Sequence, residues 1–224
     1  MGMDVRSVLV ICADTDTGYR VVQLACRAGL NAMAVVRPST DPGMYERLGA
    51  EVLKANPTNR EDIAGIFANL NIEGLAVVSI IGGSPLMNSA GNMNVINVAN
   101  EAGVRRFLLV SSIGCGDSSG AVDDFVKAFV GKALTAKSWA ERALQGTFMD
   151  WTIVRAGGML RRNFKGGAIL LDSNTVSGHI NPTDLGDAVF QALISDKTVE
   201  RVLAAVDAEQ AVDLNGDPLV AVDL

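Results

Sequence analysis

Short apolar runs alternate with amphipathic segments along most of the chain. Each run is followed by glycine or polar residues, as expected for a strand that ends in a turn. The runs cover 7–12, 31–36, 51–55, 74–81, 105–113 and 150–157, with later runs at 199–207 and 219–224. Helical spacing is found over about 17–28, 41–48, 61–70, 88–102, 122–144 and 185–194. Because the early runs are continuously apolar, they are typical of parallel strands covered on both faces.

Several helix ends carry their own signals. Asp41 followed by Pro42 predicts a helix start, and Thr58 with Glu61 has the spacing of a capping box. Gly29 lies directly after the first helical segment and predicts its C-terminal end. These signals bound helices that alternate with the strands.

Strand–helix alternation at this spacing predicts right-handed crossovers and an α/β fold with a doubly wound parallel sheet. No repeat or linker interrupts it, so residues 1–224 are predicted to form a single Rossmann-like domain, in which 158–180 is an irregular segment on the substrate side. Ligands of such sheets bind beyond the carboxyl ends of the strands. The turns after the strands, including the one at Gly82, are therefore expected to surround one site.

Composition narrows the class of protein. Hydrophobic residues make up 49% of the 224, and the net charge is −6. An acidic surface argues against binding nucleic acid through its phosphates. Three scattered cysteines and a lone histidine argue for a reduced compartment and against a zinc site. No apolar run approaches the roughly 20 residues of a membrane span, and no signal peptide is recognisable. We expect a cytoplasmic protein that binds a small molecule.

The first turn is where such a fold holds a pyrophosphate. Its glycine pattern falls on Cys12, Thr15 and Gly18, so only the last glycine remains. That glycine lets the helix pack on the strand. Asp14 and Asp16 stand where phosphate oxygens approach. A carboxylate about 5 Å from a phosphate would cost on the order of 3 kcal/mol at an effective dielectric of 20.

Two interpretations of this turn remain open. In the first, the hydroxyls of Thr15 and Thr17 donate to phosphate, and Arg20 offsets one acid. In the second, Asp14 or Asp16 caps the helix and replaces the phosphate. The first interpretation keeps a nucleotide site, and the second removes it.

The chain also resembles a known family, the atypical short-chain dehydrogenase/reductase group. Within that group it is most similar to the proteins related to biliverdin-IXβ/flavin reductase and to the nitrogen-metabolite-repressor type. The resemblance extends from about residue 7 to residue 195. It rests on six stretches in order: VLVICADTDTG, AVVRPS, GVRRFLLVSSIG, AKSWAERAL, DWTIVRAGGML and GHINPTDLGDAVFQAL.

The resemblance implies a cofactor and positions that would bind it. Arg37 matches the arginine that meets the 2′-phosphate of NADP, a role suited to an always-charged guanidinium. Gly157 and Gly158 match a turn that lies along the nicotinamide, although a simple tight turn explains them as well. With Thr15, Thr17, Gly18 and Gly82, these residues form the expected cofactor-binding set.

The implied catalytic residues are incomplete. Ser111 and Ser112 end a strand where the family has its catalytic serine. Lys137 matches the lysine of the family's Tyr-x-x-x-Lys pair, but Ala133 occupies the place of the tyrosine. Lys137 would bind the nicotinamide ribose, or it is a lysine on a helix surface.

Two functions follow. One is an NAD(P)H-dependent reductase that transfers hydride to a small planar acceptor, with Ser111 or Ser112 polarising it. The other is a non-catalytic scaffold, assembly factor or ligand sensor that has lost ordinary dinucleotide binding. A homodimer through the predicted helices 88–102 and 122–144 is a further expectation.

Overall fold

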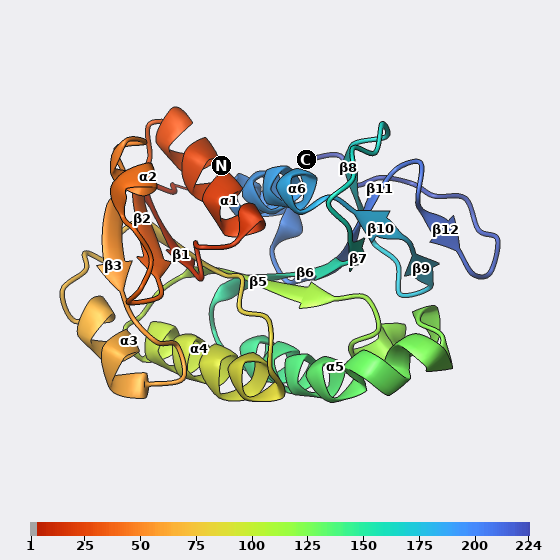
Figure 1. Ribbon diagram of the computed structural model, residues 1–224, viewed down its shortest axis with the longest axis horizontal. Helices are drawn as coiled ribbons and strands as arrows, with labels where there is room; N and C mark the ends of the chain where they lie inside the picture. The colour runs from red at the N-terminus through yellow and green to blue at the C-terminus, as the bar shows by residue number, and fades with distance from the viewer. Residues whose placement is uncertain (1–3) are drawn as a thin grey trace.

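An eight-stranded sheet separates two helical layers in the computed structural model, which describes residues 4–224 (Figure 1). The strand order is β3-β2-β1-β4-β5-β6-β11-β8, and all neighbours are parallel except β11 and β8. The strands are β1 (Ser7–Ile11), β2 (Asn31–Val36), β3 (Glu51–Lys54), β4 (Leu75–Ser79), β5 (Arg106–Ser112), β6 (Asp150–Ala156), β8 (Ala168–Leu171) and β11 (Arg201–Asp207). The predicted doubly wound α/β fold is confirmed.

Alternate strand residues explain the two layers. Val8 and Val10 of β1 are buried in one core, and Leu9 and Ile11 are buried in the other. Helices α1 (Asp16–Arg27) and α6 (Pro182–Ile194) cover the first face of the sheet, with the short α2 (Gly43–Glu46) at its edge. Helices α3 (Arg60–Phe67), α4 (Asn92–Glu101) and α5 (Asp124–Gln145) cover the second (Figure 1).

Some local predictions were wrong. Asn59, not Thr58, caps α3, because the Asn59 side chain accepts from the backbone N–H of Glu61. The helix expected over 41–48 shrinks to α2, and the carboxylate of Asp41 accepts from the N–H of Gly43 instead of starting a longer helix. The helix expected over 88–102 is confirmed as α4, and one π-helical turn, η1 (Met87–Gly91), precedes it.

The chain after β11 also departs from expectation. The run 219–224 forms no strand, and only an isolated bridge joins Ala221 to Leu171. The segment 158–180, expected to be irregular, contains short strands. One is β8, which matches the short strand expected at AILLD (168–172). The others are β7 (Gly158–Met159) paired with β10 (His179–Ile180), and β9 (Val176–Ser177) paired with β12 (Val212–Asp213).

The strand order has a switch point, where the chain changes the direction in which it adds strands to the sheet. β1 lies between β2 and β4, so the chain winds toward one side from β1 to β3 and toward the other from β4 onward. The carboxyl ends of β1, β2, β4, β5 and β6 lie together at this switch point, called here the carboxyl edge. Among the described residues, no helix is both long and apolar enough to span a membrane.

Candidate functional site

The turn between β1 and α1 keeps the shape of a glycine-rich turn without its first two glycines. Cys12 adopts a φ of 61°, a left-handed conformation that glycine adopts most easily. The hydroxyl of Thr15 accepts from the N–H of Gly18 at 3.0 Å and donates to the carbonyl of Cys12 at 3.1 Å. A Cβ on Gly18 would lie 2.7 Å from the Cα of Ala13. The helix therefore approaches the strand as closely as only glycine allows.

The first acid in the turn, Asp14, pairs with an arginine that follows β2. One carboxylate oxygen of Asp14 accepts from Nε of Arg37 at 2.5 Å and from the hydroxyl of Thr40 at 3.0 Å. Burial alone raises the pKa of Asp14, but these hydrogen bonds and the charge of Arg37 outweigh it and hold the pKa below its usual value. The guanidinium of Arg37 is itself exposed, and its two Nη atoms have no hydrogen-bond partner within residues 4–224.

The second acid pairs with a distant arginine. Asp16, the first residue of α1, accepts from Nε of Arg161 at 2.7 Å. Neither acid caps the helix, because Thr15 is the N-cap, so that part of the second interpretation was wrong. The proposed offset by Arg20 was also wrong, because Arg20 pairs with Asp187 on α6.

Backbone donors remain available in the first turn of α1. In the part of the chain that the structure describes, the N–H groups of Thr15, Asp16 and Thr17 have no acceptor. Such groups point along the helix axis and attract anions. The hydroxyl of Thr17 is not available, because it donates to the carbonyl of Pro182 at 2.9 Å and the side chain is buried.

Lys137 of α5 reaches the carboxyl edge. Its ammonium donates to the carbonyls of Ile81, after β4, at 2.9 Å and of Val110, on β5, at 3.0 Å. Burial lowers the pKa of Lys137 from 10.5 to about 8, against the opposing influence of Cys115 and other nearby acidic groups. Gly82 follows directly after Ile81, and a Cβ there would meet nothing within 4 Å.

The two candidate serines have different surroundings. Ser111 is buried, and its hydroxyl donates to the carboxylate of Glu141 at 2.5 Å. Ser112 is only partly buried, and its hydroxyl donates to the carbonyl of Ile113 at 3.0 Å. Ser112 is thus the less buried of the two serines, and the resemblance alone could not distinguish them.

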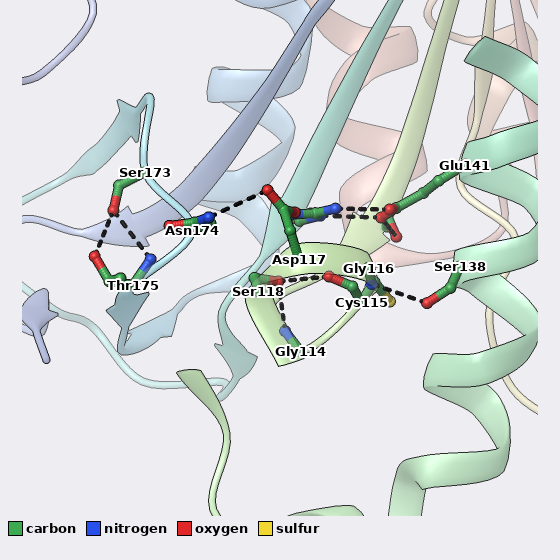
Figure 2. Close-up of polar contacts among 12 residues, drawn as sticks. Gly114, Cys115, Gly116, Asp117, Ser118, Ser138, Glu141, Ser173, Asn174 and Thr175 are labelled. Carbon is green, nitrogen blue, oxygen red and sulfur yellow. Dashed lines mark hydrogen bonds and ion pairs between the residues drawn. The ribbon is translucent and has the colours of Figure 1, made fainter. Parts of the chain in front are cut away.

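Ser111 belongs to a buried ionic network. Glu141 binds Arg155 at 2.8 Å, and both side chains are almost fully buried. Arg155 also pairs with Asp117, which accepts from the amide of Asn174 at 3.2 Å. Figure 2 shows Asp117 between Asn174 on one side and Glu141 on the other. The network joins α5 and β5 to the segment after β8.

Sequence reasoning missed this network. A signal existed, because a glutamate and an arginine stand at core positions of α5 and β6.

A polar cleft of about 360 Å³ adjoins Asp117 and Arg155. Its other arginine, Arg201, pairs with Asp172 at 2.7 Å. Both arginines of this cleft are therefore paired with carboxylates, and Glu200 adds a further negative charge to its lining.

Gly157 and Gly158 are explained by packing within the chain. A Cβ on Gly157 would lie 2.6 Å from the carbonyl oxygen of Gly178, and one on Gly158 would lie 2.9 Å from the ring of His179. The turn after β6 thus packs tightly against β10.

Comparisons with known proteins identify a matching family model and several similar proteins. The model of the NAD(P)H-binding family matches residues 13–196. A relative from Bacillus subtilis (strain 168), named an uncharacterised sugar epimerase, is 26% identical over 211 residues, which cover 90% of this chain and 94% of that protein.

Two solved structures share the fold. An anaerobilin reductase from Escherichia coli O157:H7 has a TM-score of 0.82 and 24% identity, over 91% of this chain and 98% of that one. A short-chain dehydrogenase/reductase from Veillonella parvula, solved in complex with NADP, has a TM-score of 0.70 and 12% identity, over 92% and 96% of the two chains.

Proposed function

This chain belongs to the NAD(P)H-binding family, and on that premise we propose that it holds NADPH at the carboxyl edge and reduces a small planar acceptor. The observation that carries the proposal is that both acids at the turn between β1 and α1 are paired with arginines. Asp14 is neutralised by Arg37 and Asp16 by Arg161, so the repulsion of phosphate expected from the sequence is offset.

The residues present fit an NADP-type cofactor. The unpaired N–H groups of Thr15, Asp16 and Thr17 suit a pyrophosphate. Asp14 fixes Nε of Arg37 and leaves the Nη donors for the 2′-phosphate. The open space at Gly82 leaves room beside β4. A related fold that was solved with NADP supports the same choice.

Lys137 and Ser112 would serve the reaction. A bound nicotinamide would supply the hydride. The partly accessible hydroxyl of Ser112 would orient the acceptor through a hydrogen bond. Lys137 would supply the proton, because a lysine of pKa about 8 is mostly protonated at neutral pH yet gives up its proton readily. This role compensates for Ala133, which replaces the family's tyrosine.

The test is a titration with NADPH and NADH, with Arg37→Ala beside a matched control. Removing Arg37 is expected to weaken NADPH binding by roughly tenfold or more and NADH binding by less, because only NADPH loses a guanidinium at its 2′-phosphate, whereas both cofactors then meet an unpaired Asp14. Arg105→Ala is the control, because Arg105 is exposed and lies at the opposite edge of the sheet, before β5. Equal affinities of the Arg37 and Arg105 variants for NADPH would contradict the assignment.

A second candidate is a dinucleotide-binding sensor or scaffold without turnover. It is favoured by the sequestered hydroxyl of Ser111 and by Ala133. Oxidation of NADPH in the presence of flavins, quinones and tetrapyrroles separates the two candidates. Turnover that is lost in Ser112→Ala supports the reductase, whereas tight binding with no turnover on any acceptor supports the sensor. The expected homodimer and cytoplasmic location stay predictions.

A further inference from the structure

Arg161 connects the substrate-side segment to the first turn of α1. It follows β7, 145 positions along the chain from Asp16, and its Nε donates to that carboxylate at 2.7 Å. Both side chains are open to solvent, with 81% of Arg161 and 42% of Asp16 exposed. Apart from this contact, the Arg161 side chain has no hydrogen-bond partner within residues 4–224, so its Nη donors are free.

The position of Arg161 is fixed by the backbone around it. The N–H of Leu160 donates to the carbonyl of Ile180 at 3.0 Å, and the carbonyl of Arg162 accepts from the amide of Asn181 at 2.8 Å. The next residue, Pro182, accepts from the hydroxyl of Thr17 at 2.9 Å. The segment 160–162, the start of α6 and the first turn of α1 are therefore joined at one place.

We propose that Arg161 is a ligand of the cofactor's pyrophosphate through its free Nη donors and that Asp16 holds its Nε in position. This inference rests on the proposed function, since it assigns a residue to the same site. Asp16 engages only Nε of Arg161, so Arg161 can keep this ion pair while its Nη donors bind phosphate. A pyrophosphate carries more charge than one carboxylate and matches the planar guanidinium with two parallel hydrogen bonds.

The contact of Arg161 with phosphate has a consequence for the order of binding. The N–H groups of Asp16 and Thr17 hold the phosphate from one side, and Arg161 would close on it from the other. Binding of the cofactor then fastens residues 158–165 over the carboxyl edge. Because this segment also carries the exposed side chain of Lys165, the acceptor would meet its full site only after the cofactor has bound.

Three single variants test the inference by NADPH titration, followed by nicotinamide fluorescence. Arg161→Ala is expected to weaken NADPH binding roughly tenfold. Asp16→Asn is expected to weaken it by less than Arg161→Ala does, because Arg161 loses the carboxylate that positions it but keeps its charge. Arg162→Ala is the matched control: it removes the same charge from an exposed neighbour whose side chain has no ion-pair partner among the described residues, and it should change affinity less than twofold.

A second readout does not depend on affinity. Bound NADPH should slow amide hydrogen exchange in residues 158–165 of the wild type and of Arg162→Ala, but not of Arg161→Ala. Equal affinities of the Arg161 and Arg162 variants, with equal protection of the segment, would overturn this inference and leave the proposed function intact. A wild type that binds no NADPH would overturn both.

Discussion

Lys137 should lower the stability of the folded protein, and its replacement by methionine should reveal the cost. The pKa of Lys137 falls from 10.5 to about 8 because its ammonium is buried. At about 1.4 kcal/mol for each pH unit, keeping this side chain charged at pH 7 costs about 3 kcal/mol. Methionine has a similar length but cannot donate to the carbonyls of Ile81 and Val110, and the loss of these hydrogen bonds destabilises the variant by about 1 kcal/mol. Lys137→Met is therefore expected to be about 2 kcal/mol more stable than wild type at pH 7.

The difference in stability between Lys137→Met and the wild type should depend on pH in a definite direction. In the unfolded chain Lys137 keeps its proton up to about pH 10.5, whereas in the folded chain it loses the proton near pH 8. Between these values the unfolded state binds more protons, so the free energy of unfolding of the wild type rises with pH relative to the variant. The advantage of Lys137→Met should fall by about 2 kcal/mol between pH 7 and 9.5.

Urea unfolding of both proteins at pH 7, 8, 9 and 9.5 measures the difference directly. The Cys12 thiol, whose pKa burial raises to about 12, stays protonated in the folded chain over this range. It loses its proton only in the unfolded chain, where the two proteins are alike, so its contribution largely cancels. A difference that stays constant across this range would refute the burial argument for Lys137. The same variant should lose turnover, because the site keeps a costly buried charge for its chemistry.

Two substitutions test the packing and the network of the site. Gly18→Ala should lower the free energy of unfolding, measured with urea, by about 2–3 kcal/mol, because the new Cβ would meet backbone atoms at 2.7 Å. Gly65→Ala is the control, because a Cβ there meets nothing within 4 Å. Equal stabilities of the two variants would contradict the close approach at Gly18. Glu141→Ala should lower it by about 3 kcal/mol, because Arg155 loses its buried partner; a thermal melt unchanged from wild type would mean that Asp117 alone satisfies Arg155.

The layers of the fold could be predicted because most strands are apolar over most of their length. Residues such as Val8 and Leu9 face opposite layers, and both layers are buried. The final run 219–224 has the same apolar character but forms no strand, because a strand needs a partner along its length and here only Ala221 forms a bridge. Local pattern identifies a strand more safely than it identifies the strand's partner.

The electrostatics of the first turn could not be predicted from the sequence. The effect of Asp14 and Asp16 on a phosphate depends on which cations face them. Their partners, Arg37 and Arg161, stand 23 and 145 positions away along the chain. The nearby Arg20, which the sequence suggested, faces α6 instead. Glu141 and Arg155 were missed for a similar reason, because each looks like one polar residue in an apolar segment until the fold brings them together.

Calorimetric titration of the wild-type protein with NADPH tests the central claim most directly. The account predicts saturable binding in the micromolar range with one site per chain, because both acids of the first turn are paired and its backbone donors are free. No heat of binding up to millimolar NADPH would contradict it, and Thr15 would then cap a helix end that no longer holds a phosphate.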